Sequence, residues 1–241
     1  AITKYGPWVD VMDTKDVLEE TSRLLAQRNI VGWFQGGSEF GPRALGHRSI
    51  LCDTRFGDMK DILNAKVKHR EGFRPFAPSI LEEYNQEYFE LAVPSPYMLL
   101  IAQVKKPEAV PAITHVDNSA RVQTVNRADN GIFYDLIAAY HRLTGVPVVL
   151  NTSFNVDGEP IVETPQDAIR CFLGTHMDYL VLGNVLLKKR PILWMIFHAW
   201  PKDLKRITTN SGKALAARLP ILKKLKKVIV TKSQPSIKVP G

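Results

Sequence analysis

The sequence has few cysteines and no long apolar run, and these two shortages exclude several classes of protein. Cys52 and Cys171 are its only cysteines, far apart and outside any CxxC pattern, which argues against a zinc site and against a disulfide framework. We expect two buried thiols in a reducing compartment. Apolar runs are no longer than the one from Ile192 to Phe197, whereas a membrane-spanning helix needs about 20 such residues. No charged-then-apolar leader opens the chain, so we expect a cytoplasmic protein.

Several familiar catalytic signatures are also missing. The chain contains no P-loop, no GxGxxG fingerprint, no GxSxG elbow and no recognisable Ser–His–Asp arrangement. His115 and Asp117 have the spacing of two metal ligands on one strand, but the sequence offers no obvious third ligand. We therefore predict no metal site.

Charge is unevenly distributed along the 241 residues. The net charge is +8, but residues 188–241 hold 14 Lys/Arg and one acidic residue, which leaves 18 basic and 23 acidic residues in 1–187. We predict a globular domain over 1–190 and a basic tail over 191–241. The acidic balance of the domain argues against nucleic acid as its partner, because phosphate contacts need clustered surface cations.

Helical and extended patterns alternate within the predicted domain, with hairpins between them. Apolar periodicity and capping residues predict helices over 14–28, 58–67, 132–145 and 164–174. Short apolar runs predict strands over 30–35, 49–52, 76–81, 97–103, 121–126, 146–150, 179–182 and 185–188. This pattern favours an α/β fold, a twisted mixed parallel/antiparallel sheet with flanking helices.

The segment from Gly36 to Pro78 combines a glycine-rich loop with many cations. A domain that is acidic overall is expected to direct some of these cations at an anion, since arginine binds phosphate and carboxylate oxygens in pairs. The alternative is a solvated surface with ordinary ion pairs. The cations are Arg43, Arg48, Lys66, Lys68, Arg70 and Arg74.

A second polar segment, 151–160, directly follows the predicted strand 146–150. Short polar residues at the carboxyl end of a strand are where α/β folds place ligand contacts. Ser153 and Asn155 would share one side if the backbone stayed extended, although Asn, Ser, Asp and Gly also favour turns.

Together these segments resemble a known family. GPRALGHRSIL, NAKVKHREGFRPFAPS, THVDNSARVQTV and GVPVVLNTSFNVDGEPIVETPQDAI stand in the order and spacing of the carboxy-terminal domain of the O-carbamoyltransferases of nodulation-factor and antibiotic biosynthesis. The similarity runs from about Ile30 to Leu187. It implies a YrdC-like fold that uses ATP, with Mg²⁺, and carbamoyl phosphate to make carbamoyl adenylate. It also implies a partner: an amino-terminal domain with an actin-like ATPase fold and bound iron, absent here, which passes the carbamoyl group to a hydroxyl.

The resemblance also implies the site residues. YrdC-like proteins carry a Lys-x-Arg plus Ser-x-Asn tetrad, which Lys68, Arg70, Ser153 and Asn155 match. The arginines of the matching family motifs line the cleft, which points to Arg43, Arg74 and Arg121. We assign Lys68, Arg74 and Arg43 to catalysis, and Asn151 joins the binding residues. Two alternatives remain: a non-catalytic ATP-binding or docking module, and an RNA-modification-related protein.

The basic tail needs a separate explanation. Leucines from Leu215 to Leu225 share a helical face beside lysines, with Trp194 and Trp200 nearby, which is typical of a helix on a membrane surface. Peripheral attachment at the inner membrane surface is one expectation. A docking helix for the absent domain, or a disordered end, is the other, since Pro220 interrupts the pattern.

Overall fold

One mixed sheet organises the part of the chain that the structure, a computed structural model, describes: residues 2–72 and 74–191. Its strand order is β1-β9-β8-β2-β3-β7-β4-β6-β5. The strands are β1 (Val9–Met12), β2 (Val31–Phe34), β3 (Arg48–Asp53), β4 (Ala77–Leu81), β5 (Leu100–Gln103), β6 (Ser119–Val125), β7 (Val148–Ser153), β8 (Tyr179–Leu182) and β9 (Val185–Lys189).

Strands in this sheet run in both directions. β2 pairs with β8 and β4 with β6 in parallel, and the other neighbouring pairs are antiparallel. The predicted mixed α/β fold is confirmed. A division of the chain falls between Arg190 and Pro191. The predicted tail lies, from residue 192 onward, outside the described residues.

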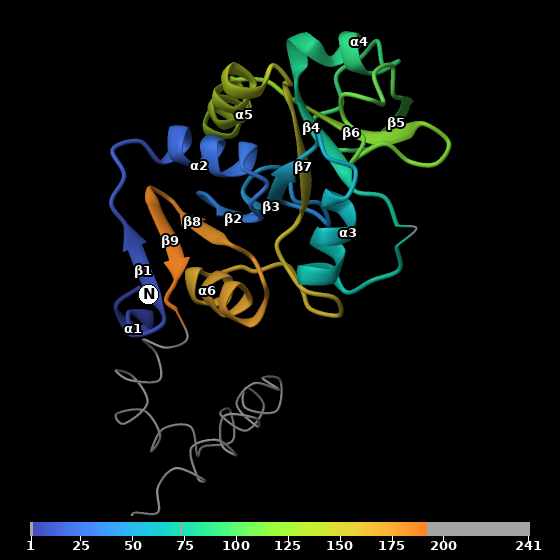
Figure 1. Cartoon of the computed structure of the whole chain (residues 1–241). Helices are drawn as coiled ribbons and strands as arrows, with labels where there is room; N and C mark the ends of the chain where they lie inside the picture. Colours follow the sequence, from blue (N-terminus) through green and yellow to red (C-terminus); the bar gives the residue numbers. More distant parts are fainter. Residues whose placement is uncertain (1, 73, 192–241) are drawn as a thin grey trace, which may run out of the picture. The chain divides into compact units, whose positions relative to one another are not determined.

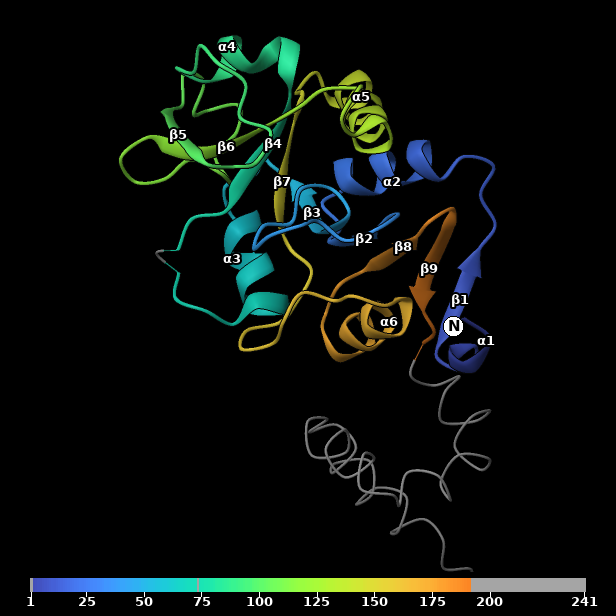
Figure 2. The same ribbon diagram turned by 180° about the vertical axis from the view of Figure 1, so that it is seen from behind.

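Helices cover both faces of the sheet. α2 and α5 pack side by side on one face, and α3 and α6 lie on the other, as Figures 1 and 2 show from opposite sides. The helical elements are α1 (Ile2–Tyr5), α2 (Val17–Ala26), α3 (Met59–Leu63), the π-helical turn η1 (Asn64–Lys68), the 3-10 turn η2 (Glu82–Tyr84), α4 (Asn85–Tyr88), α5 (Gly131–Thr144) and α6 (Pro165–Gly174).

Two apolar cores lie on the two faces of the sheet. Trp33 and Phe133 are fully buried in the core beneath α2 and α5, and Phe154 and Phe172 in the core beside α3 and α6. Both cysteines are free and buried, as expected. Burial raises the pKa of the Cys171 thiol to about 12, so it is protonated at neutral pH and a poor nucleophile.

The structure differs from the sequence predictions in several places: the short helical elements α1, η2 and α4 have no predicted counterpart, β7 continues to Ser153, and three further elements differ as follows. The sequence predicts no strand before residue 14, whereas β1 pairs there with β9. The strand predicted from residue 97 begins only at Leu100, because Met98 has a φ of +57°, which no regular strand accommodates. The helix predicted over 58–67 divides into α3 and η1, which ends at the left-handed residue His69. Single π turns of this kind are frequent at functional sites.

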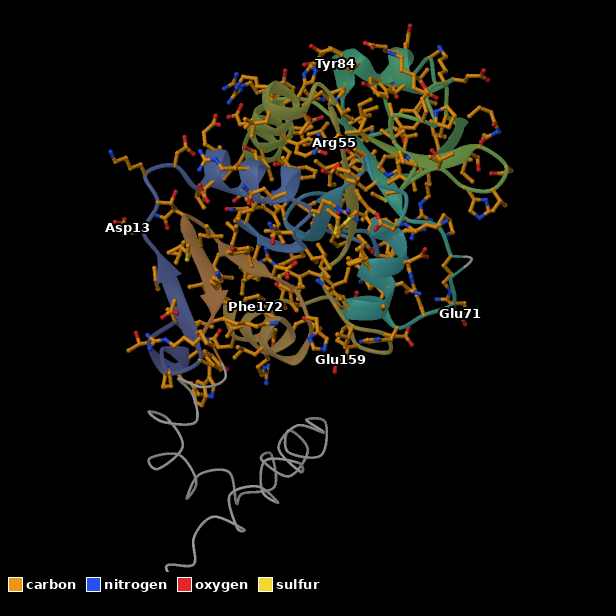
Figure 3. All side chains as sticks on the ribbon, in the orientation of Figure 1. Asp13, Arg55, Glu71, Tyr84, Glu159 and Phe172 are labelled. Atoms are coloured by element: carbon orange, nitrogen blue, oxygen red, sulfur yellow. The ribbon has the colours of Figure 1, made fainter. Side chains whose placement is uncertain are left out.

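The start of α6 is closed by a capping box, as the sequence predicts. Thr164 Oγ1 accepts the N–H of Asp167, and the Asp167 carboxylate accepts the N–H of Thr164. Thr164→Ala is expected to lower the free energy of unfolding by about 1 kcal/mol, as cap losses commonly do. Urea unfolding would measure this. Asp13→Ala changes an exposed residue at the outer edge of Figure 3 and should stay within about 0.5 kcal/mol. Equal losses in both variants would contradict the cap's role.

Candidate functional site

Four segments that carry the predicted site residues meet at one edge of the sheet. β2 and β7 end at this edge, and β3, β4 and β6 begin there, as the registers Ser49–Ser153, Ala77–Asn151 and Ser79–Gln123 require. The loop that follows Lys68 and the loop that follows β7 are marked in Figure 3 by Glu71 and Glu159. The predicted placement of polar residues at a strand's carboxyl end is therefore what the structure has.

Lys68, at the end of η1, reaches the end of β7. Its Nζ donates to Ser153 O (2.5 Å), Asn155 Oδ1 (2.8 Å) and Asn155 O (3.0 Å), and lies 3.3 Å from Ser153 Oγ. The residue is only 4% exposed. Burial, followed by the nearby positive charge of Arg70, lowers the pKa of the Lys68 ammonium to about 7. Near neutral pH, Lys68 is therefore present in both its ammonium and its amine form.

Ser153 and Asn155 meet, but not on an extended strand. Ser153 Oγ donates to Asn155 Oδ1 (2.7 Å), and Asn155 N donates to Ser153 O (3.0 Å), so the chain turns directly after β7. Asn155 Nδ2 donates to Glu159 O (2.7 Å) and anchors the following loop. The turn, rather than strand alternation, brings both side chains to Lys68.

Three arginines form a cationic cluster beside this lysine: Arg43, Arg70 and Arg121. Burial and the charges of Arg43 and Arg70 lower the pKa of the Arg121 guanidinium, and burial and Arg74 lower that of Arg70. The Nε atoms of Arg70 and Arg121 are buried without a hydrogen-bond partner. Within the described residues, no guanidinium of the three makes a hydrogen bond or an ion pair with another protein group. Arg70 lies over the Phe76 ring at 4.6 Å.

Other cations of the predicted set are engaged elsewhere. Arg74 is half-exposed and pairs with Glu71 at 2.9 Å. Arg48 is buried: its guanidinium stacks on Phe34 and donates to main-chain carbonyls, including Gln35 O at 2.8 Å. Lys66 lies 3.7 Å from Asp178. The sequence treated these cations as one group, and the structure separates Arg48 and Lys66 from the cluster, whereas Arg74 lies close enough to lower the pKa of Arg70.

The loop that carries Arg43 is held from several directions. The buried Glu39 carboxylate accepts the N–H groups of Leu45 (2.6 Å), His47 (2.8 Å) and Arg48 (3.2 Å). Gly46 has a φ of +108°, and a Cβ there would lie 2.3 Å from the Phe133 ring. Glu39 is a residue that the sequence analysis missed, although a lone carboxylate within a glycine-rich loop was the available signal.

Asn151, predicted as a ligand contact, is only 1% exposed. Its Nδ2 donates to Ala44 O at 3.1 Å, beneath the loop that carries Arg43. Its contacts are therefore with the protein scaffold.

The described residues hold neither a cluster of metal ligands nor a membrane-spanning helix. No group of three His, Cys, Asp or Glu side chains in the described residues could hold a metal ion. His115 Nδ1 lies 3.2 Å from Asp117 Oδ1, which also accepts from Ser119 Oγ. No helix in that part is long and apolar enough to cross a membrane.

Comparison with known families identifies the chain. Residues 22–189 match the family described as "Carbamoyltransferase C-terminus". The chain belongs to this family. Nodulation protein NolNO of Sinorhizobium fredii is 45% identical over 211 residues, which cover 86% of this chain and 30% of that protein. An uncharacterized protein of Synechocystis sp., sll1178, is 50% identical over 202 residues, which cover 75% of this chain and 33% of that protein. The carbamoyltransferase domain thus spans about a third of the length of these relatives.

Solved structures share the fold at low sequence identity. HypF of T. kodakarensis aligns with a TM-score of 0.54 and 18% identity over 76% of this chain and 22% of HypF. P. abyssi Sua5, complexed with L-threonine, aligns with a TM-score of 0.52 and 16% identity over 69% of this chain and 46% of Sua5. The predicted YrdC-like fold is confirmed by these neighbours.

Proposed function

We propose that this carbamoyltransferase domain makes carbamoyl adenylate from ATP and carbamoyl phosphate. The observation that carries the proposal is the cluster of Arg43, Arg70 and Arg121, three guanidinium groups without a protein acceptor in the described structure, next to Lys68. The charges of Arg43 and Arg70 lie close enough to lower the pKa of the Arg121 guanidinium, and an anion bound among the three would offset this repulsion. Two phosphorylated substrates supply that charge. A solved HypF structure, related in fold, contains phosphate and nucleotide, which agrees with this proposal.

The proposed reaction has two balanced steps. Water first cleaves carbamoyl phosphate into carbamate and phosphate. A carbamate oxygen then forms a bond to the α-phosphorus of ATP, and the bond to the bridging oxygen breaks, which releases pyrophosphate. Fixed cations stabilise the charge on the phosphoryl oxygens, and positioning of the two anions supplies much of the remaining acceleration.

We assign roles to the site residues as follows. Arg43 and Arg74 bind carbamoyl phosphate, and Arg74 would exchange its exposed contact with Glu71 for the anion. Arg70 and Arg121 bind the nucleotide phosphates, and Lys68 joins them by exchanging one of its three protein acceptors for a phosphate oxygen. Ser153 Oγ would exchange Asn155 Oδ1 for a phosphate oxygen, and Asn155 would orient Lys68. Mg²⁺ would arrive with ATP and be held mainly by its phosphates.

Transfer of the carbamoyl group belongs to the whole protein. We propose that a domain with an actin-like ATPase fold and bound iron, in the same chain or a partner, receives carbamoyl adenylate and passes the carbamoyl group to a hydroxyl of a small molecule or glycan. A cytoplasmic location remains our proposal, as does membrane-surface attachment through the basic tail.

The lowered pKa of Lys68 gives the proposal a pH dependence. If the ammonium form binds phosphate, kcat/KM should fall about tenfold per pH unit as pH rises above 7, since kcat/KM reports the free enzyme.

The free energy of unfolding depends on pH in the opposite direction. The unfolded chain keeps this proton up to about pH 10.5, so burial of Lys68 costs the folded state most below pH 7, and the free energy of unfolding rises as pH increases from 7 to 10.5. In Lys68→Arg, kcat/KM should stay constant above pH 7, because arginine keeps its proton. The same fall of kcat/KM above pH 7 in this variant as in the wild type would contradict the assignment.

Exchange of labelled pyrophosphate into ATP tests the proposed function. The purified 241-residue chain should catalyse this exchange only when carbamoyl phosphate is present. Exchange without carbamoyl phosphate, or none from folded protein that binds ATP, would contradict autonomous adenylation and favour a binding module.

A further inference from the structure

We propose that Gln123 is a positioning residue that sets the distance between Arg43 and Arg121. The inference rests on the proposed function for its catalytic consequence, but its structural part is independent of it. Gln123 lies two residues after Arg121 on β6, and its side-chain amide already bonds to Ser79, Asn151 and the main chain of Leu45, so we do not place it among the phosphate-binding residues. It acts through the loop that carries Arg43.

A buried hydrogen-bonded cluster of three side chains, which we call the amide hub, carries this proposal. It consists of Ser79, Gln123 and Asn151, from the neighbouring strands β4, β6 and β7. Gln123 Oε1 accepts from Ser79 Oγ (2.5 Å) and Asn151 Nδ2 (3.0 Å), and Asn151 Nδ2 also lies 3.0 Å from Ser79 Oγ. All three residues are at most 3% exposed.

The amide hub binds the loop through main-chain carbonyls next to Arg43. Asn151 Nδ2 donates to Ala44 O at 3.1 Å, and Gln123 Nε2 donates to Leu45 O at 2.9 Å. These bonds fix the amide orientations as well, because both carbonyl oxygens can only accept. Gln123 is thus one side chain that joins the strand of Arg121 to the loop of Arg43.

Two members of the hub, Gln123 and Asn151, each lie two residues from a site residue on the same strand. Gln123 follows Arg121, and Asn151 precedes Ser153, so each pair faces the same side of its strand. A movement of Gln123 or Asn151 therefore moves a site residue with it. The hub thus connects β6 and β7, which carry Arg121 and Ser153, with the loop that carries Arg43.

Arg43 and Arg121 need such a connection because their charges repel. Arg43 is one of the groups that lower the pKa of Arg121. A loop held less firmly would move Arg43 away from Arg121 when no anion is bound. Asn151 Oδ1 is buried without a partner, but the other side-chain donors and acceptors of the hub are paired, and such buried hydrogen bonds stabilise the position of the loop against this repulsion.

Trp33 gives a readout of loop position that requires no substrate. Its buried indole Nε1–H donates to Gly46 O at 2.8 Å, one residue beyond the Leu45 carbonyl. In Gln123→Met, hydrogen exchange of this indole proton should become about tenfold faster or more, because the loop opens more often. A Trp33→Phe variant identifies the signal in the NMR spectrum.

Thr124→Val is the matched control. Thr124 is the next residue on β6, buried to the same degree, and its Oγ1 accepts from Ser95 N on the other face of the strand. The Thr124→Val variant loses a buried hydrogen bond that does not involve the loop that carries Arg43. Indole exchange that accelerates equally in both variants would overturn the proposal, since general loosening would then explain it.

Binding and activity complete the experiment, at a temperature at which circular dichroism shows every variant folded. Pyrophosphate affinity should fall about tenfold in Gln123→Met and stay unchanged in Thr124→Val. The kcat of carbamoyl-phosphate-dependent exchange should also fall, which a change in stability alone would not cause.

If Gln123→Met does not fold, Gln123→Glu replaces it, since it keeps the oxygen that accepts from Ser79 but removes the donor to Leu45. Unchanged indole exchange and affinity would overturn the proposal. Absence of exchange activity in the wild type, with these shifts present, would refute only the proposed function.

Discussion

Lys68→Ala is expected to lower carbamoyl-phosphate-dependent ATP–pyrophosphate exchange by about a hundred- to a thousandfold, the loss typical of a fixed group that stabilises transition-state charge. The expectation depends on geometry: three oxygens within 3.0 Å hold the ammonium in place before substrate arrives. A preorganised cation needs no reorientation as charge develops on the phosphoryl oxygens. The exchange rate under saturating substrates measures the effect.

Lys66→Ala is the matched control for this variant. Lys66 belongs to the same π turn, but it pairs with Asp178 and its side chain is 42% exposed. Removal of such a surface pair costs about 1 kcal/mol or less and should leave exchange unchanged. Comparable losses in both variants would mean that the turn, and not the Lys68 charge, matters.

Arg121→Leu is expected to change stability and binding in opposite directions. Its guanidinium is partly desolvated, is repelled by Arg43 and Arg70, and leaves Nε buried without a partner. Replacement by an apolar side chain removes these costs, so the melting temperature should stay equal or rise. Pyrophosphate affinity should fall about ten- to a hundredfold, the value of one or two hydrogen bonds to a charged group.

Calorimetry on the same samples measures both quantities, with Arg127→Leu as control. Arg127 is exposed and lies beside Asp135 at 3.1 Å, away from the cluster. It should change neither quantity by much. A marked loss of stability in Arg121→Leu together with intact pyrophosphate binding would show that Arg121 is a structural residue.

Much of the fold could be predicted from the sequence because its local patterns agree with the final packing. The Thr164 cap, the Gly183–Asn184 hairpin and the apolar run after Gly145 each specify an element without tertiary information. β1 could not be predicted in this way. It has only four residues, and its place depends on pairing with β9, which lies far away in sequence.

Some residues of the site could be predicted from the sequence, and others could not. Lys68, Ser153 and Asn155 could be named because a resemblance, not a spacing rule, joined segments 85 residues apart. The amide hub could not. Ser79 is a single polar residue within the apolar strand β4, Gln123 is one of several polar residues of β6, and only the sheet register brings them together. Arg48 shows the reverse case, since composition cannot tell a cation that binds main-chain carbonyls from one that awaits a ligand.

Direct detection of the product tests the central claim most directly. The 241-residue chain is incubated with ATP, Mg²⁺ and ¹³C-labelled carbamoyl phosphate, and the mixture is followed by ³¹P and ¹³C NMR and by mass spectrometry. The account predicts a ¹³C-labelled carbamoyl adenylate, with phosphate and pyrophosphate released in equal amounts and no product in Lys68→Ala. Formation of ADP, or of phosphate alone without a labelled adenylate, from folded protein that binds both substrates would contradict it.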